Sequence, residues 1–410
     1  MIPLTLAEVA GLQLGRLQQA AGTSEVTGVQ VDSRRISAGD LFVAVGTGRD
    51  YVDDALARGA GAALDPDDAL AALAAIGGVV RRRSEARIVG ITGSVGKTST
   101  KDILAAICAP HARTVAAEAS FNNEIGVPLT LCRLEPETEI CVLELAMRGV
   151  GQIAELCAFA GPDVGVITAV GPAHVELLGS LDAVAVAKSE LVEALPPGGT
   201  AIVPEDFPVA RGDLEIARFG EPDARVEGGR TAIRFAGRDV WFDFTPRHQA
   251  RNALAALHAA RAIGIEAAGE VEVVFSRWRG DEVELPGGGL LVNDSYNANP
   301  MSMRAALEHL VRVAAGRRTV AVLGEMAELG EDRVLYHEEI GRDARELGID
   351  VVVGVGDLAR RYEPEAWCAD AVAAVAVARG LVLPGDCVLV KASRAAGLEI
   401  VADALVSVHA

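Results

Sequence analysis

The sequence predicts an α/β protein with three domains. From residue 88 onward, short apolar runs rich in β-branched residues alternate with helix-patterned stretches, which is typical of parallel sheets covered by helices on both faces. The chain has 410 residues, 50% of them hydrophobic, so it is long enough to form two or three cores. Changes of pattern divide it into residues 1–86, 87–279 and 280–410.

The first region is expected to be a small α/β domain that contains a basic turn. Two short strands, Val26 to Val31 and Gly39 to Val45, flank this turn, and an alanine-rich stretch follows. On these residues alone, Ser33 and Arg34 in the turn are interpreted as solvated. The polar run Arg81 to Glu85 is expected to be a linker to the second region.

The second region opens with a phosphate-binding loop (P-loop) that joins an apolar strand to a helix. The usual spacing places a glycine at position 91, where this chain has Ile91, so the loop is a compact Thr-Gly-x-x-Gly-Lys-Thr variant. Lys97 is expected to reach the β- and γ-phosphates, and Thr98 to hold Mg²⁺. A structural turn is the alternative. The residues predicted to bind nucleotide here are Gly93, Ser94, Gly96, Lys97, Thr98 and Ser99.

Polar residues follow the next strands of this region. Glu144 ends the strand Ile140 to Leu145, His174 follows the strand Val164 to Thr168, and Lys188 lies on the next helix. Ligands of parallel sheets bind at the carboxyl ends of strands, and Mg²⁺ needs hard oxygen ligands. The alternatives are a solvated edge for the glutamate, a loop histidine with a structural partner, and a surface lysine.

The third region is predicted to be a second, Rossmann-like α/β domain with four strands. The tract from Asn293 to Pro300 is unusually polar for the exit of a buried strand. Asn299 and Pro300 make a good helix start, but a helix start does not explain why Asp294 and Asn297 are polar. A site that faces the nucleotide of the second region would explain both. The four strands are expected at Leu290 to Asn293, Thr319 to Leu323, Val351 to Val353 and Cys387 to Val390.

Composition limits the possible partners and the location. The formal charge of −19 argues against nucleic acid as a partner, although an anionic small substrate remains possible. The six cysteines form no Cys-x-x-Cys pair and are expected to be buried free thiols of a reduced cytosol. Neither a signal peptide nor a membrane-spanning apolar run is evident, so we expect a cytoplasmic protein without membrane insertion.

Taken together, these motifs resemble those of the Mur ligase family along essentially the whole chain. The P-loop is shared by all Mur ligases and by folylpolyglutamate synthetases. The strings at 122–126 and 295–300 are much more particular to the members that add D-alanyl-D-alanine. The resemblance rests on residues 92–98, 121–128, 144–149, 171–174, 187–190, 278–279, 294–300 and 324–330.

The resemblance implies a ligase in which residues 1–86 bind the UDP part of the substrate, residues 87–279 form a P-loop ATPase domain, and residues 280–410 close over the site. The carboxylate of UDP-N-acetylmuramoyl-tripeptide attacks the γ-phosphate of ATP, and the amine of D-alanyl-D-alanine displaces phosphate from the resulting acyl phosphate. The third residue of the tripeptide is left open between diaminopimelate and lysine. We expect a monomer.

The resemblance also assigns residues to tasks. Catalysis and Mg²⁺ binding fall to Lys97, Thr98, Glu144 and His174, with Lys188 carbamylated so that it can hold a second metal ion. Adenine contact falls to Asn252, and further nucleotide contacts fall to Arg279, Asp294 and Asn297. The substrate-binding residues implied are Ser33 and Arg34 for the uridine nucleotide, together with Asn122, Asn123, Glu124, Lys391, Ser393 and Arg394.

Three positions depart from the family pattern. Gln249 replaces an asparagine, so adenine contact is expected to rest mainly on Asn252. Ala392 replaces a glycine and is expected to alter a backbone approach near the acceptor amine. The stretch 46–51 is shorter than its usual counterpart and lacks its Asp-Gly-His element, which leaves room for a modified donor.

Two other interpretations compete with this one. The first is a different amide ligase of the same superfamily, acting on another amino acid or on a polyglutamate chain; the tract 295–300 argues against it. The second is a non-catalytic nucleotide-binding regulator. A regulator would leave Glu144, His174, Lys188 and the second α/β domain without a task.

Overall fold

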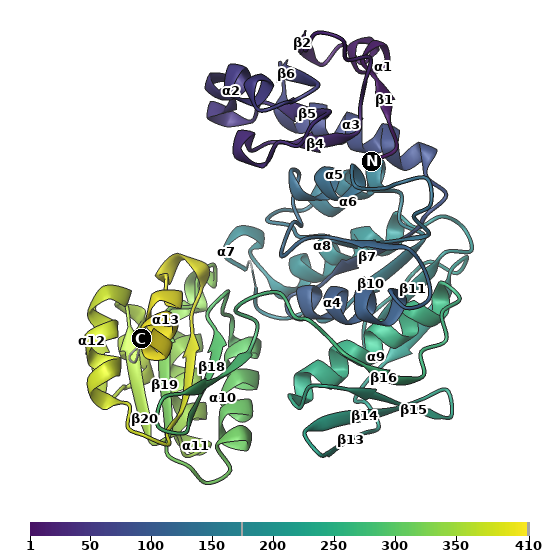
Figure 1. Cartoon of the computed structure of the whole chain (residues 1–410). Helices are drawn as coiled ribbons and strands as arrows, with labels where there is room; N and C mark the ends of the chain where they lie inside the picture. Colours follow the sequence, from purple (N-terminus) through teal and green to yellow (C-terminus); the bar gives the residue numbers. More distant parts are fainter. Residues whose placement is uncertain (174, 408–410) are drawn as a thin grey trace.

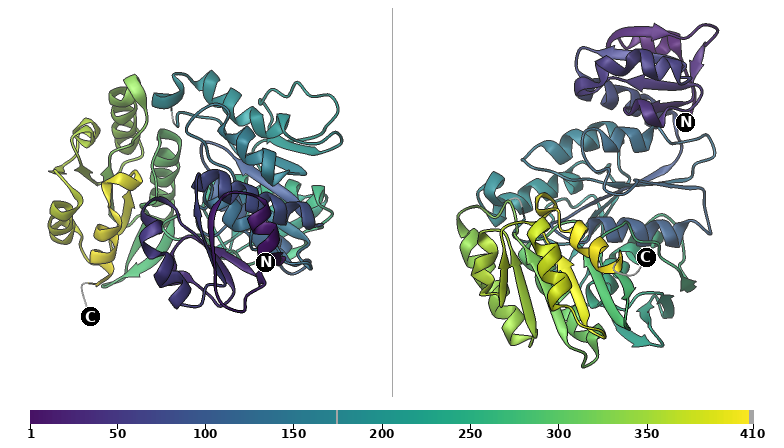
Figure 2. Two further views of the ribbon diagram at one scale, coloured as in Figure 1. Left: turned by 90° about the horizontal axis from the view of Figure 1, so that it is seen from above. Right: turned by 60° about the vertical axis from the view of Figure 1, so that its left-hand side comes forward.

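The computed structural model describes residues 1–173 and 175–407. It consists of three parts that follow one another along the chain (Figure 1). The N-terminal part lies at one end of the central part, and the C-terminal part lies beside the central part, as the turned views also show (Figure 2). The fold is α/β throughout, as the sequence predicts.

The N-terminal part contains a four-stranded sheet in the order β2-β6-β5-β4, in which only β2 runs antiparallel to its neighbour. Strands β1 and β3 form a separate antiparallel pair. Its elements are β1 (Leu4–Thr5), α1 (Leu6–Gly11), β2 (Gly15–Gln19), β3 (Glu25–Val26), β4 (Gly28–Gln30), η1 (Ser33–Arg35), β5 (Asp40–Val43), η2 (Gly46–Tyr51), α2 (Val52–Ala57), β6 (Ala62–Pro66) and α3 (Ala69–Arg83).

The linker predicted at Arg81 to Glu85 is wrong, because Arg81, Arg82 and Arg83 form the last turn of α3. The Arg81 guanidinium donates hydrogen bonds to the carbonyl oxygens of Ala160, at 3.0 Å, and Gly161, at 3.1 Å, in the central part. Most of this polar run is therefore the end of a helix that docks on the neighbouring part.

The central part is built on a six-stranded parallel sheet in the order β12-β11-β10-β7-β9-β8. Helices α4 and α9 cover one face, and α5, α6 and α8 cover the other (Figure 1). Both faces are buried, which explains the continuous apolar runs in the sequence. Its elements are β7 (Arg87–Thr92), α4 (Lys97–Cys108), β8 (Thr114–Ala116), α5 (Gly126–Leu131), β9 (Ile140–Glu144), α6 (Gln152–Ala160), β10 (Val164–Ile167), α7 (Val175–Leu178), α8 (Leu181–Glu193), β11 (Thr200–Pro204), β12 (Glu215–Phe219) and α9 (Arg247–Ala262).

A smaller sheet in the order β13-β14-β15-β16 is attached to the central part. Its antiparallel strands are joined by turns at which Gly228, Gly229 and Gly237 all have positive φ. The strands are β13 (Ala224–Glu227), β14 (Arg230–Phe235), β15 (Arg238–Phe242) and β16 (Gly269–Val271).

The C-terminal part has a six-stranded sheet in the order β17-β18-β22-β19-β20-β21, in which only β17 is antiparallel. The four predicted strands are present, and β17 and β21 are edge strands that the sequence analysis missed. Asn299 and Pro300 start α10 with a capping box, as predicted. Its elements are β17 (Asp281–Leu285), β18 (Gly289–Asp294), α10 (Pro300–Ala314), β19 (Thr319–Gly324), η3 (Gly330–Asp332), α11 (Arg333–Glu346), β20 (Val351–Val355), η4 (Leu358–Tyr362), β21 (Ala366–Cys368), α12 (Ala371–Leu381), β22 (Cys387–Lys391), η5 (Arg394–Ala396) and α13 (Glu399–Val406).

One expectation from composition is met. All six cysteines are buried free thiols, as their positions in apolar runs predict. Within residues 1–173 and 175–407, none of the helices is long and apolar enough to cross a membrane.

We predict that Arg81→Ala lowers the free energy of unfolding by about 1–3 kcal/mol, because the carbonyl oxygens of Ala160, Gly161 and Ser84 all lose their donor. Arg82→Ala, at the exposed neighbouring position of the same helix turn, is the matched control and should change it by less than about 0.5 kcal/mol. Urea unfolding followed by circular dichroism measures both. Equal stability of the two variants would contradict the docking role of Arg81.

Candidate active site

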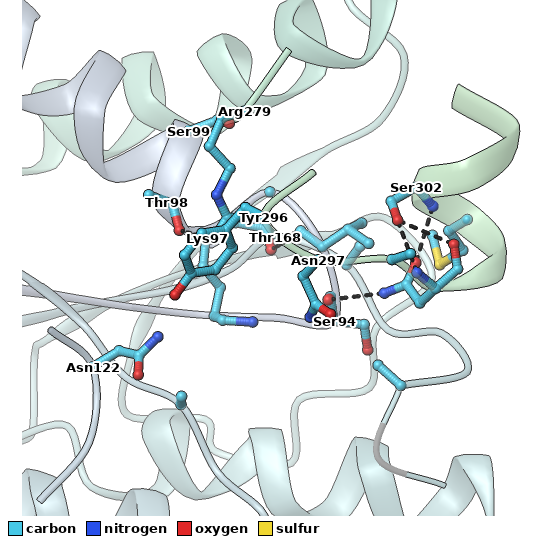
Figure 3. A pocket seen from close by; sticks show the side chains of 18 of the residues that line it. Ser94, Lys97, Thr98, Ser99, Asn122, Thr168, Arg279, Tyr296, Asn297 and Ser302 are labelled. Atoms are coloured by element: carbon cyan, nitrogen blue, oxygen red, sulfur yellow. Dashed lines mark hydrogen bonds between the residues drawn. The ribbon is translucent and has the colours of Figure 1, made fainter. Parts of the chain in front are cut away.

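A cavity of about 860 Å³ lies at the carboxyl edge of the central sheet, where the C-terminal part faces it (Figure 3). The loops after β7, β9 and β10 line one side, and residues after β18 and β22 line the other. The predicted site residues that the structure brings together there are Ser94, Gly96, Lys97, Thr98, Ser99, Asn122, Asn123, Glu124, Glu144, Asn252, Arg279, Asp294, Asn297, Lys391, Ser393 and Arg394.

The P-loop depends on glycine at two positions. Gly96, the residue before α4, has a φ of 82°, and a Cβ built on it would lie 2.3 Å from Asn252 Oδ1. A Cβ on Gly93 would lie 1.9 Å from Thr168 Oγ1. The loop is therefore packed closely between α9 and the end of β10, and its backbone N–H groups at the start of α4 remain available for an anion.

Lys97 lies at the first position of α4 with its Nζ 2.6 Å from the carbonyl oxygen of Gly93. Burial lowers the pKa of Lys97; Glu144 acts in the opposite direction, and Arg279 lowers it further. A half-buried ammonium beside a second cation is suited to an anionic ligand, because phosphate oxygens would stabilise its charged form.

Glu144 ends β9 inside the cavity and is 1% exposed. Asn122 donates a hydrogen bond to its Oε1 at 2.7 Å, whereas the buried Oε2 has no partner among the described residues. Thr98, also buried, accepts a hydrogen bond from Arg279 at 3.0 Å. An orphaned carboxylate oxygen and a threonine hydroxyl are hard oxygen donors, so they fit a Mg²⁺ ion.

Lys188 lies on α8 and is 1% exposed, so the surface-lysine alternative is wrong. Burial holds its pKa well below the usual value, and the charge of Lys97 adds to this effect. Lys188 does not line the cavity itself, nor does Gly93. His174 lies outside the described residues.

Asn252 packs against Gly96 of the P-loop, and a chain of hydrogen bonds holds its side chain there. Its Nδ2 donates to Gln249 Oε1 at 2.9 Å, and Gln249 Nε2 donates to Ser99 Oγ at 3.2 Å. The departure at Gln249 thus has a structural effect, because the longer side chain links Asn252 to α4. Asn252 lines the cavity, and its adenine contact stays a prediction.

The C-terminal side of the cavity carries an ion pair between a buried lysine and a half-buried aspartate. Asp294 and Lys391 are register partners at the ends of β18 and β22, and Lys391 Nζ lies 2.5 Å from Asp294 Oδ2 and 2.9 Å from the carbonyl oxygen of Asn297. Burial lowers the pKa of Lys391, while Asp294 raises it. The pair places one cation and one carboxylate at the edge that faces the P-loop.

Ala392 does not affect the cavity in the way expected. It is fully buried, and its Cβ packs against Gly324 of β19, where an added Cβ would lie only 2.6 Å away. Its side chain therefore belongs to the core of the C-terminal sheet rather than to the cavity. Ser393 and Arg394 do line the cavity: Ser393 Oγ accepts from Ala327 N at 2.8 Å, and Arg394 stacks on Trp278.

Ser33 and Arg34 are not brought to this cavity. Ser33 is buried in η1, and Arg34 forms an exposed ion pair with Asp32 at 2.7 Å. The same turn contacts the central part through Arg35, which pairs with Glu118 at 3.2 Å. The turn therefore contacts the central part without lining the cavity.

Several residues that line the cavity are not predicted from the sequence, including Thr168, His248 and Tyr296. Burial lowers the pKa of His248 to about 3, with a further contribution from His309, so its imidazole is neutral at physiological pH. Tyr296 and Asn299 lie in the polar tract that had been singled out. Asn299 Nδ2 contacts the carbonyl oxygen of Ser94 at 3.4 Å, so the helix-capping residue also bridges the two parts.

Comparison with known proteins agrees with this geometry. The Mur ligase middle domain model matches residues 91–260, and the model "Mur ligase, glutamate ligase domain" matches residues 278–394. The chain is 36% identical to a relative in Mycobacterium tuberculosis, with 99% of this chain and 98% of the relative covered. It aligns with crystal structures from Acinetobacter baumannii (TM-score 0.85, 27% identity, 99% of each chain) and Thermotoga maritima (TM-score 0.79, 27% identity, 93% of this chain and 97% of the other).

The chain therefore belongs to the Mur ligase family and has its three-domain fold. Within that family, the relative in M. tuberculosis is a UDP-N-acetylmuramoyl-tripeptide–D-alanyl-D-alanine ligase, and the two crystal structures are of MurF. The T. maritima structure is a complex with ADP.

We predict that Gly96→Ala lowers the free energy of unfolding by about 2–4 kcal/mol, because it combines a left-handed φ with a clash at Asn252. Asn252→Ala in the same chain removes the clash but not the backbone strain, so the double variant should recover part of the loss. Urea unfolding of the two single variants and the double variant measures this coupling. Strict additivity would contradict the close packing of the two residues.

Proposed function

We propose that this chain is the ATP-dependent ligase that joins D-alanyl-D-alanine to UDP-N-acetylmuramoyl-tripeptide in peptidoglycan precursor synthesis. One observation carries the proposal: the cations Lys97, Arg279 and Lys391 line a single cavity together with Glu144, whose Oε2 has no partner among the described residues. Two anions, a peptide carboxylate and a triphosphate, must come together in this reaction, and such a cavity is suited to them.

Each part has a proposed task. Residues 1–86 bind the UDP portion through Ser33 and Arg34, residues 87–279 bind ATP, and residues 280–410 close over the site. Asn122, Asn123 and Glu124 face the donor peptide, and Lys391, Ser393 and Arg394 face the acceptor. The support is their placement, because the last six line the same cavity as the P-loop. The six free cysteines support a cytoplasmic location.

The first step forms an acyl phosphate. The tripeptide carboxylate oxygen attacks the γ-phosphorus of ATP, and the bond to the bridging oxygen breaks to release ADP. Lys97 and the backbone N–H groups of the P-loop stabilise the charge on the phosphoryl oxygens. Arg279 reaches the same oxygens from its position beside Thr98, and Asn252 and Asp294 position the nucleotide.

The second step forms the amide. The free amine of D-alanyl-D-alanine attacks the acyl carbon, phosphate leaves with the electrons of the broken acyl–oxygen bond, and the amine loses a proton. Lys391 and Arg394 orient the acceptor by its carboxylate. Closure of the C-terminal part excludes water, which would otherwise hydrolyse the acyl phosphate.

Mg²⁺ would be held by Thr98, Glu144 and His174. When bound, the ion would neutralise part of the negative charge of the phosphates. The support lies in the hard oxygen donors and in the buried Glu144 Oε2 that no described residue satisfies.

Lys188 is proposed to act as a carbamate. Burial and the charge of Lys97 lower the pKa of Lys188, which favours its neutral amine, and a neutral amine adds to carbon dioxide with loss of one proton. The product is an anion with two oxygens. It replaces the repulsion between Lys188 and Lys97 with attraction and supplies further hard ligands for a metal ion.

The function is tested by measuring phosphate release from ATP with Mg²⁺, the UDP-linked tripeptide and D-alanyl-D-alanine, omitting one component at a time. Release that needs both peptide substrates, with a matching mass of the joined product, supports the ligase. If ATP binds but neither peptide stimulates release, the assignment fails.

We predict that Glu144→Gln reduces kcat by about 10²-fold or more, because the amide keeps the size of the side chain but removes its negative charge. Asn122→Asp is unsuitable as a control because it adds a charge at the same place. Glu155→Gln on α6, outside the cavity, is the matched control and should leave kcat unchanged. Steady-state kinetics at saturating ATP distinguish them, and comparable rates for Glu144→Gln and the native chain would refute the metal-binding role.

We predict that Lys188→Ala loses at least about 10²-fold in activity and regains part of it when a short carboxylic acid such as formate is added. The added carboxylate occupies the space of the missing side chain and restores the anionic oxygens. Initial rates over a range of formate concentrations measure the rescue. Rescue by methylamine instead would show that an ammonium is required at this position.

A further inference from the structure

Tyr296 lies on the polar tract after β18 and contacts the central part and the connecting segment at once. Its ring stacks on the Arg279 guanidinium, 3.9 Å from the ring centroid, and Arg279 in turn donates to Thr98 Oγ1 at 3.0 Å. Its hydroxyl is hydrogen-bonded to the hydroxyl of Ser120. Figure 3 shows Tyr296 among the labelled side chains Lys97, Thr98 and Arg279.

The two residues that Tyr296 contacts, Arg279 and Ser120, each connect it to the proposed phosphate and metal site. Arg279 connects it to Thr98, a residue proposed to bind Mg²⁺. Ser120 lies two residues before Asn122, whose side chain holds Glu144 Oε1 at 2.7 Å. A single side chain of the C-terminal part therefore contacts both segments that orient oxygen donors on the central part.

The two segments are fixed to the central part by a buried ion pair on α4. Lys101 is 2% exposed and donates to the carbonyl oxygens of Ala117, at 2.7 Å, and Ala119, at 3.0 Å, just before Ser120. Asp102, beside it, accepts from the backbone N–H of Ser276 at 2.8 Å, three residues before Arg279. After these fixed points, one segment contacts Tyr296 through Ser120 and the other through Arg279.

We propose that Tyr296 is a positioning residue that couples docking of the C-terminal part to assembly of the phosphate site, through Arg279 on one side and Ser120 on the other. The inference rests on the proposed ligase function for its rate effects. When the C-terminal part is docked, the ring holds the guanidinium against Thr98, and the hydroxyl holds the segment that carries Asn122. When it is displaced, both supports are lost together.

The first test is steady-state kinetics of Tyr296→Phe, Ser120→Ala and the double variant. Tyr296→Phe keeps the ring over Arg279 and removes only the hydroxyl contact. Loss of one hydrogen bond should lower kcat by about 3- to 10-fold in each single variant, with a smaller change in KM for ATP. The double variant should be no slower than the slower single variant, because both changes remove the same contact.

Tyr296→Leu removes the ring as well and should lower kcat by about 10- to 100-fold. Tyr336→Phe is the matched control: it removes a tyrosine hydroxyl from α11, away from the cavity, and should leave kcat unchanged. If Tyr296→Phe has native kinetics while Tyr296→Leu is impaired, the proposed role of the hydrogen bond between Tyr296 and Ser120 is overturned. Multiplicative losses in the double variant would overturn it as well.

A second readout is independent of ligase turnover. Binding of adenylyl imidodiphosphate, a non-hydrolysable ATP analogue, is measured by calorimetry with and without Mg²⁺. The gain in affinity that Mg²⁺ produces should fall by about 3-fold or more in both Tyr296→Phe and Ser120→Ala. An unchanged gain would overturn the coupling to the metal site. If the native chain shows no turnover with the peptide substrates, the proposed function fails, but this titration still decides the role of Tyr296.

Discussion

The site is organised around positive charge at the carboxyl edge of a parallel sheet. Lys188 is buried on α8, Lys97 is half-buried at the start of α4, and the charge of Lys97 lowers the pKa of Lys188. Placing cations close together away from water costs free energy unless anions join them. Lys97, Arg279 and Lys391 line the cavity where a triphosphate and a peptide carboxylate would meet, so charges that are unfavourable in the free site would stabilise the loaded one.

The parallel sheet is what brings these groups together. Loops after β7, β9 and β10 all emerge at the same edge, so the P-loop, Glu144 and Thr168 become neighbours although they are far apart in sequence. The C-terminal sheet brings residues together in the same way. Its strands β18 and β22 are adjacent and parallel, so Asp294 lies beside Lys391 at their carboxyl ends. Two such edges face one another, and Arg279 lies in the segment that connects them.

Much of the fold was predictable because its signals are local. Buried parallel strands leave continuous apolar runs, and the P-loop and the cap of α10 depend on backbone conformations that favour glycine, asparagine and proline. The errors arose where packing overrides such signals. Arg81 looked like part of a linker because it is charged, yet carbonyl groups of another helix satisfy it. Ala392 looked like an active-site change, yet its methyl group fills the space that Gly324 leaves in the core.

The sequence by itself determined the order of elements, the P-loop and the chemical types of the site residues, because each follows from short-range backbone preferences and side-chain chemistry. Only the tertiary structure decided which of those residues share a cavity: it joins Glu144 to Asn122 and Tyr296 to Arg279, and it keeps Ser33 and Arg34 apart from the P-loop. It also decided that Lys188 is buried. The reason is physical, since desolvation and contact depend on neighbours that the fold brings in from distant positions, and no local pattern records them.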